Sequence, residues 1–272
     1  MSVDIARARS FIKASGSAIE RARLHALVDG VTPPAMPDEL RALQNDDGGF
    51  ALGQIAGRPS ALSPTAYVLS WLRDLGLTAS PEARRALRYI ETRQTRRGIW
   101  RESAELQRYQ PPPWMDPESV AADIYTTALC ASTLATLGGD ELAADQAVIW
   151  LQTQQGRDGL LNGFKAHSSW LAVPAFAEIL GQETRATRRL IAGLGELLAD
   201  DWSAGMLAWM LQCLLDAGYT RRTRLVERAW QLLGAAQQPD GSFPVDEDDD
   251  PLQTALQAID VAQRIEQDDD DV

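Results

Sequence analysis

The sequence has few of the residues from which metal centres and disulfide frameworks are built. Its 272 residues include only two Cys and two His. Cys130 and Cys213 are isolated within apolar helical patterns, without a Cys-x-x-Cys spacing, and we expect both to be buried free thiols. His25 and His167 are equally isolated, which gives no basis for a zinc site or a Ser-His-Asp triad. The composition therefore excludes a disulfide-rich scaffold and predicts no metal centre of Cys and His.

Basic charge is also scarce. The 26 Lys and Arg face 38 Asp and Glu, which gives a formal net charge of −12. A chain of this sign repels nucleic-acid phosphates and anionic lipid headgroups, so we expect no nucleic-acid partner. Nine of the acids lie in two runs, 246–250 and 268–271, so the acidity is local. The second run repels itself and predicts a disordered acidic tail over 268–272.

Long apolar runs are missing as well. Charged residues interrupt the first positions from Asp4 to Arg9, where a signal peptide needs an apolar core. No later stretch has the roughly 18 consecutive apolar residues that cross a bilayer. Neither a Gly-x-x-x-x-Gly-Lys loop nor a dinucleotide-binding glycine pattern is present. We expect a cytoplasmic protein that uses neither ATP nor a nicotinamide cofactor.

A short sequence pattern recurs four times. Each copy has a Gln, a polar turn, a Gly and then a bulky apolar residue two positions beyond the Gly. The copies lie at 43–50, 94–100, 151–161 and 237–243. We interpret each as a helix end that is closed by a glycine in the left-handed conformation, with the apolar residue folding back over the turn.

Helix starts follow most of these turns. Ser63-Pro64, Asp123 and Asp250-Pro251 each open an apolar helical pattern with a capping residue. Other helical patterns lie at 81–93, 143–152, 204–215 and 224–235. The chain is thus predicted to be mostly helical, with about five to six helix pairs that are enough to close one ring. The Pro-rich segment 107–117 is predicted to be a non-helical insertion.

Two of these segments resemble a known superfamily, the toroids of protein prenyltransferase β-subunits and of squalene-hopene and class II terpene cyclases. Gln44 to Gly53, followed by Pro64-Thr65-Ala66, is similar to the Gly-Gly-Phe turn and Leu-x-Pro-Thr helix start of the prenyltransferases. The segment 238–243 with Gln253-Thr254-Ala255 is similar to the turn and helix start of the squalene cyclases. The resemblance implies an all-α fold, a single (α/α) toroid of inner and outer helices over residues 1–267.

In that superfamily the inner barrel holds an isoprenoid chain. The resemblance implies that inner helices begin at Pro64, Asp123, Ser168, Trp202 and Pro251. Aromatic rings on these helices would line the cavity and stabilise carbocations through their faces. For each ring the alternative is ordinary packing between helices. The candidate substrate-binding residues are Tyr67, Trp71, Tyr125, Trp170, Trp202 and Trp209.

The superfamily's catalytic motifs are altered in this chain. The prenyltransferase zinc ligands are missing, because Asp123 is followed by no Cys and Gln253 occupies the His position. Asp123 to Ala128 resembles the Asp-x-Asp-Asp-Thr-Ala motif of class II cyclases, but Tyr125 stands at the proton-donor position and Thr126 at the last Asp. A phenol is too weak an acid to protonate an alkene. We therefore interpret Asp123 as a helix cap.

A literal Asp-x-Asp-Asp pattern occurs elsewhere, at 246–249, about one helical turn before the expected position. Crowding among these carboxylates would raise one pKa and retain a proton, with Asp248 as the donor and Asp246 and Asp249 as orienting partners. The same carboxylates would suit Mg²⁺, and with it a diphosphate, although no cofactor is certain. The alternative is a solvated acidic loop at a helix N-terminus.

The sequence supports two hypotheses. The first is a terpenoid-cyclase-like enzyme that cyclises a polyprenyl diphosphate or polyene by protonation, working alone, with a partner protein or as a homo-oligomer. The second is a non-catalytic toroid that binds an isoprenoid or a protein. Arginines in the turn segments would hold a diphosphate by forked hydrogen bonds, or form surface salt bridges. They are Arg58, Arg96, Arg97 and Arg101.

Overall fold

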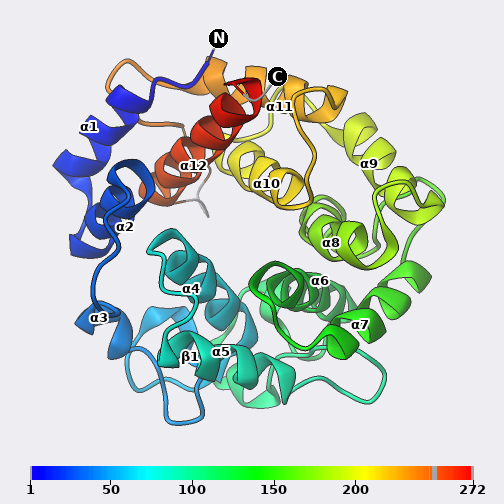
Figure 1. The fold of residues 1–272 in the computed structure, drawn as a ribbon. Coiled ribbons are helices and arrows are strands. Elements are labelled where there is room, and N and C mark those ends of the chain that lie inside the picture. The colour runs from blue at the N-terminus through cyan, green and yellow to red at the C-terminus, as the bar shows by residue number, and fades with distance from the viewer. Residues whose placement is uncertain (1, 245, 247–249, 271–272) are drawn as a thin grey trace. The chain divides into compact units, whose positions relative to one another are not determined.

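The computed structural model describes residues 2–244, 246 and 250–270, and these are mainly helical, as the all-α expectation requires (Figure 1). The chain divides into two compact units. Unit 1 contains Met1–Thr32 and Gly195–Val272, and unit 2 contains Pro33–Leu194. The expectation of one toroid domain over 1–267 stays a prediction.

Unit 2 is built around three helices in succession, α4 (Leu62–Asp74), α6 (Val120–Leu137) and α8 (Lys165–Leu180). α4 packs against α6, and α6 against α8 (Figure 1). α5 (Pro81–Glu91) packs on α4, and α7 (Glu141–Thr153) packs on both α6 and α8. Short elements complete the unit: α3 (Asp38–Arg41), β1 (Phe50–Ala51), η1 (Leu52–Gln54), β2 (Ser60–Ala61), η2 (Ala104–Tyr109) and η3 (Pro113–Met115). β1 and β2 pair antiparallel, with Phe50 opposite Ala61.

Residue spacing decides which helices are central in unit 2. α5 buries only Ala83, Ala86, Tyr89 and Ile90, a single face at helical spacing. In α6, by contrast, every residue from Ala122 to Leu134 is buried. A helix that is covered on all sides is apolar all round. The length and mean hydropathy of α6 therefore also match those of a membrane span, which corrects the expectation that no stretch of the chain has this character. Because 72% of it is buried within the protein, we interpret it as a core helix.

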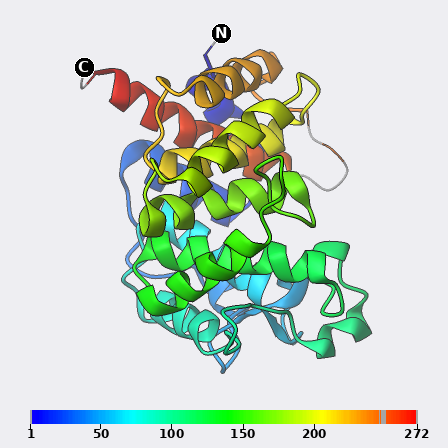
Figure 2. The ribbon, with the colours of Figure 1, turned by 90° about the vertical axis from the view of Figure 1, so that its right-hand side faces the viewer.

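Unit 1 joins the two ends of the described chain. It contains α1 (Ile5–Ser15), α2 (Ala18–Asp29), α10 (Ala204–Asp216), α11 (Arg224–Ala236) and α12 (Pro251–Asp270), while α9 (Arg185–Leu197) runs across the boundary between the units. α12 packs against α10, α1 and α2 (Figures 1 and 2). The described helix reaches position 270, whereas the sequence predicts a disordered tail from 268.

The four repeated turns have the positive-φ glycine and the buried apolar residue that their sequence pattern predicts, and they also share a contact of the Gln side chain that it does not predict. In each, the Gln side-chain nitrogen donates to a backbone carbonyl at or near the start of a helix, and the Gly four positions later has a positive φ. The pairs are Gln44–Gly48, Gln94–Gly98, Gln155–Gly159 and Gln237–Gly241, which contact α5, α7, α9 and α1 in turn. The bulky residues that follow, Phe50, Trp100, Leu161 and Phe243, are all buried.

The close approach of backbones explains the glycine. At Gly159, with φ +86°, an added Cβ would lie 2.2 Å from the carbonyl oxygen of Arg189 on α9. At Gly241 the same atom would lie 2.1 Å from the carbonyl oxygen of Arg7 on α1. Only a residue without a side chain fits there.

Some helix starts differ from the predicted ones by a few residues. Of the five inner helix starts that the resemblance implies, only that of α12 is found at the expected residue, while α4, α6, α8 and α10 begin at Leu62, Val120, Lys165 and Ala204. The helical patterns predicted to begin at 81, 204 and 224 do begin there, as α5, α10 and α11. The Pro-rich segment 107–117 carries parts of two short 3₁₀ turns and no α-helix, in agreement with the prediction.

Candidate functional site

Two of the predicted substrate-binding aromatics meet in unit 2. Tyr67 on α4 and Tyr125 on α6 are joined by a hydrogen bond between their hydroxyl groups. The Tyr125 ring also meets Phe164 edge to face, with ring centroids 6.2 Å apart. Burial raises the pKa of the Tyr67 phenol, against the opposing effect of the Tyr125 hydrogen bond. The phenol therefore stays neutral, so this pair offers hydroxyls and ring faces but no strong acid.

The other four aromatics have different surroundings. Trp170 is fully buried on α8 and packs on His167, with ring centroids 4.4 Å apart. Trp71 on α4 is half-buried in unit 2. Trp202 and Trp209 are half-buried in unit 1. Trp170 therefore fits the alternative stated above, ordinary packing between helices, better than contact with a substrate.

Two charged residues, Arg101 and Glu102, follow the turn after α5. The sequence did not predict the partners of either residue. Arg101 and Glu102 are neighbours in the chain but serve different helices. Both carboxylate oxygens of Glu102 accept backbone N–H groups at the start of α4, from Leu62 and Ser63, each at 2.8 Å. Arg101 donates to Asp123 of α6, from Nε to Oδ1 at 2.8 Å and from Nη2 to Oδ2.

The electrostatics of the two residues differ. Burial raises the pKa of Glu102, which is only 4% exposed, and this effect outweighs its backbone hydrogen bonds. The Asp123 carboxylate, through its hydrogen bonds and its charge, raises the pKa of Arg101 further above its already high value. Glu102 was missed because no local spacing links it to a helix that begins 40 positions earlier.

Asp123 is not the helix cap that the sequence predicts. α6 begins three residues earlier, and Ser119 caps it by accepting a hydrogen bond from the Ala122 N–H. Asp123 lies within the first turn of the helix, buried, with both carboxylate oxygens bound by Arg101. The carboxylate at this position is therefore already committed to an ion pair.

The acidic cluster is described only in part. Asp246 is exposed, and Asp250 caps α12 by accepting the Leu252 N–H at 2.8 Å. Asp248 and Asp249 lie outside the described residues, so the predicted proton donor and one of its partners have no position here. Among the described residues there is no group of three or more His, Cys, Asp or Glu placed to hold a metal ion.

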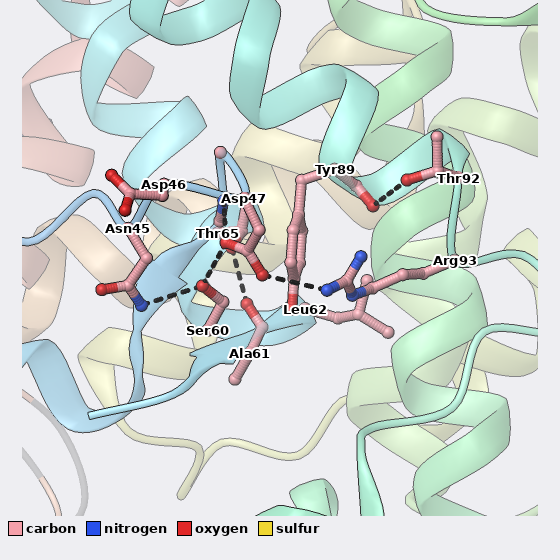
Figure 3. Close-up of polar contacts among 12 residues, drawn as sticks. Asn45, Asp46, Asp47, Ser60, Ala61, Leu62, Thr65, Tyr89, Thr92 and Arg93 are labelled. Atoms are coloured by element: carbon pink, nitrogen blue, oxygen red, sulfur yellow. Dashed lines mark hydrogen bonds and ion pairs between the residues drawn. The ribbon is translucent and has the colours of Figure 1, made fainter. Parts of the chain in front are cut away.

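A polar cleft of about 430 Å³ opens in unit 2 beside the first repeated turn (Figure 3). It lies between that turn, the segment 57–60, the end of α5 and the segment 103–109. The hydrogen bonds of the cleft converge on the Asp47 carboxylate. Its Oδ1 accepts the Ser60 hydroxyl at 2.7 Å, and its Oδ2 accepts Nη2 of Arg93 at 2.9 Å. The side-chain amide of Asn45 donates to the Ser60 hydroxyl at 2.9 Å.

Two stacked arginines line the cleft. The Arg93 guanidinium lies beside the Tyr89 ring (Figure 3), and its distance from the ring centroid is 3.8 Å. The Arg58 guanidinium lies 5.4 Å from the centroid of the Tyr109 ring. Of the four turn arginines singled out by sequence, Arg58 lines this cleft and Arg101 is paired with Asp123, while Arg96 and Arg97 are exposed. The described structure therefore does not gather them into one diphosphate site.

Comparison with known proteins connects the fold to solved structures only. No family model matches the chain, and no curated protein matches its sequence. The type II terpene cyclase MstE from Scytonema, without ligand, is similar with a TM-score of 0.60 at 16% identity, over 97% of this chain and 88% of that chain. An R337A variant of MstE in complex with geranylgeranyl dihydroxybenzoate, its substrate, gives 0.58 at 14% identity, over 96% and 86%.

A segment of native alpha-2-macroglobulin from Escherichia coli, from domain MG7 to the C-terminus, is also similar. Its TM-score is 0.56 at 19% identity, over 98% of this chain and 42% of that chain. At such identities the likeness shows the fold alone. The chain has a terpene-cyclase-like, all-α fold.

Proposed function

We propose that the protein is a terpene-cyclase-like enzyme that binds an isoprenoid and cyclises it by protonation. The observation that supports this most is the likeness to MstE over nearly the whole length of both chains, including a form bound to a geranylgeranyl substrate. The isoprenoid would be a polyprenyl diphosphate or a polyene.

The aromatic residues would contact the substrate. The hydrogen-bonded pair Tyr67 and Tyr125 would hold an apolar chain against neutral rings, and Trp71, on the same helix as Tyr67, would add a further ring face. Such faces stabilise a positive charge that develops on carbon. The Arg101 to Asp123 ion pair would keep the buried Asp123 carboxylate from trapping that charge.

Asp248 is the proposed acid. Its carboxyl O–H would add a proton to a terminal alkene, which leaves a tertiary carbocation on the substrate and a carboxylate on the enzyme. Attack by the next alkene would close a ring, and loss of a proton would end the sequence and restore the acid. Asp246 and Asp249 would orient Asp248, and the same carboxylates are the proposed site for Mg²⁺.

Incubation with candidate substrates tests the proposal. The purified protein would be mixed with geranyl, farnesyl and geranylgeranyl diphosphate, squalene and geranylgeranyl dihydroxybenzoate, with and without Mg²⁺, and the products would be read by mass spectrometry. We expect a cyclised product from at least one of them, lowered at least 100-fold by Asp248→Asn, as for the loss of a general acid. Asp145→Asn removes an exposed acid on α7 and is expected to leave turnover unchanged.

A second candidate function, an isoprenoid- or protein-binding toroid, is favoured by the ion pair at Asp123 and by the likeness to a segment of alpha-2-macroglobulin. Thermal stabilisation by an isoprenoid without any conversion would support this candidate and overturn the cyclase. Light scattering of the same sample would show whether the chain works as a monomer or as a homo-oligomer. If the protein neither binds nor converts any of the five compounds, the isoprenoid proposal fails.

A further inference from the structure

We propose that the polar cleft of unit 2 is a binding site for an oxyanion, such as the phosphate or diphosphate group of a small polar molecule. The site is independent of the proposed cyclisation. Apart from Arg58, which the sequence also suggests as a ligand of a diphosphate, it uses none of the residues named for that reaction, and all of its lining residues belong to unit 2.

Arg58 is the cation available to a ligand. Within the described residues its guanidinium forms no ion pair, and its partner is the Tyr109 ring. A cation held over a ring face is attracted by the ring and not by hydrogen bonds, so this contact restricts the Arg58 side chain without using its N–H donors. The fork of donors is thus left for a planar or tetrahedral anion.

Arg93 is held in place from two sides. Its guanidinium stacks on Tyr89, and one terminal nitrogen is bound to Asp47. Asp47 is itself fixed, because its other oxygen accepts both the Ser60 hydroxyl and the Gly49 N–H, the latter at 3.1 Å. The hydrogen bonds of Asp47 therefore position Arg93, whose side chain is still 41% exposed at the cleft.

The charges of the lining residues sum to zero, so recognition of an anion depends on the N–H donors of Arg58 and not on the net charge of the cleft. The Asp47 charge is balanced by Arg93, which leaves Arg58 and the exposed Glu105 as the charged groups without an ion pair among the described lining residues. Ser103 adds a hydroxyl at the same wall. The volume of about 430 Å³ exceeds that of a bare phosphate and lies in the usual range for small-molecule sites. The ligand class is therefore a small molecule with an oxyanion at one end.

Calorimetric titration with three probes tests the site: inorganic pyrophosphate, inorganic phosphate and succinate. We expect saturable binding of pyrophosphate, weaker binding of phosphate, and at least a tenfold loss of pyrophosphate affinity in Arg58→Gln. Arg97→Gln is the matched control, because it removes the same charge from an exposed position outside the cleft. Glu105→Gln is expected to strengthen binding, since it removes the nearby negative charge.

The source of the oxyanion follows from the same titrations. Preference for succinate over both phosphates would assign the site to carboxylates, and preference for pyrophosphate would assign it to phosphorylated compounds. Equal weakening by Arg58→Gln and Arg97→Gln would overturn the site, because it would show only the general charge of the surface. Absence of binding to all three probes at millimolar concentration, by a protein whose circular dichroism is native, would overturn it too.

Discussion

The starts of α4 and α6 are stabilised in opposite ways by two consecutive residues. At α4 the distant carboxylate of Glu102 accepts two backbone N–H groups, and both partners are buried. At α6 the local Ser119 caps the helix, and the charge of the buried Asp123 is balanced by Arg101, whose side chain is 54% exposed. The first arrangement depends on fixed backbone dipoles, and the second on a side chain that water also solvates.

The difference shows how one turn can order two helices. A carboxylate at a helix N-terminus satisfies donors that have no partner within the helix. An exposed arginine cannot replace that function, but it can neutralise a carboxylate that the helix carries inward. Loss of Glu102 leaves backbone groups unsatisfied, whereas loss of Arg101 leaves a buried charge unpaired.

The largest effect is expected from Glu102→Ala. It removes the acceptor for two buried N–H groups, and hydrogen bonds to charged groups contribute about 1.5–3 kcal/mol each, offset in part by relief from burying the charge. We expect the free energy of unfolding in urea to fall by about 3 kcal/mol. Glu105→Ala, at an exposed position of the same segment, is the control. An equal and small effect of both variants would show that the start of α4 does not need the carboxylate.

A smaller and asymmetric effect is expected at α6. Arg101→Met leaves the Asp123 carboxylate buried without its partner, which we expect to cost about 2 kcal/mol, less than the roughly 3–5 kcal/mol of a fully buried pair because Arg101 is half-exposed. Asp123→Asn leaves a solvated arginine and a neutral amide, and we expect a loss of about 1 kcal/mol or less. Urea unfolding of both variants and of the double variant measures the coupling. If Asp123→Asn lowers the free energy of unfolding more than Arg101→Met does, the cost of a buried, unpaired carboxylate is not the main effect at this pair.

The smallest effect is a dependence on pH. Burial raises the pKa of Glu102 above its ordinary value of 4.5, so the folded protein retains a proton that the unfolded chain has lost. The stability from this group is fully present below pH 4.5 and is lost as the pH rises through the folded-state pKa. The unfolding free energies of the natural protein and of Glu102→Gln would be measured across this pH range. Their difference isolates the pH dependence that is due to Glu102. A difference that rises with pH instead would mean that the backbone hydrogen bonds, not burial, dominate the pKa.

The sequence predicted what local rules determine. The turn pattern of Gln, Gly and a buried apolar residue identified all four turns, because a left-handed glycine and its neighbours are read from adjacent positions. The all-α class followed from the same repeats. Helix starts were displaced by up to three residues, as at α6, because Ser119 caps that helix rather than Asp123.

The candidate site was less predictable, since its contacts join distant parts of the chain. Glu102 and the start of α4 are 40 positions apart, and Tyr67 and Tyr125 are 58 apart. The cleft was missed because the partners of Asp47, Ser60 and Arg93, come from separate turns. The acid proposed from sequence, Asp248, lies outside the described residues and stays a prediction.

The contact between the fourth turn and α1 has a consequence for synthesis of the protein. Gln237 binds the backbone of Asp4, which is 233 positions earlier, and Gly241 packs on the carbonyl of Arg7. At about 5–20 residues per second, a ribosome takes roughly ten to fifty seconds to make the intervening chain. During that time α1 and α2 have left the ribosome without α12 to cover them, so unit 1 completes its folding only after α12 has been made.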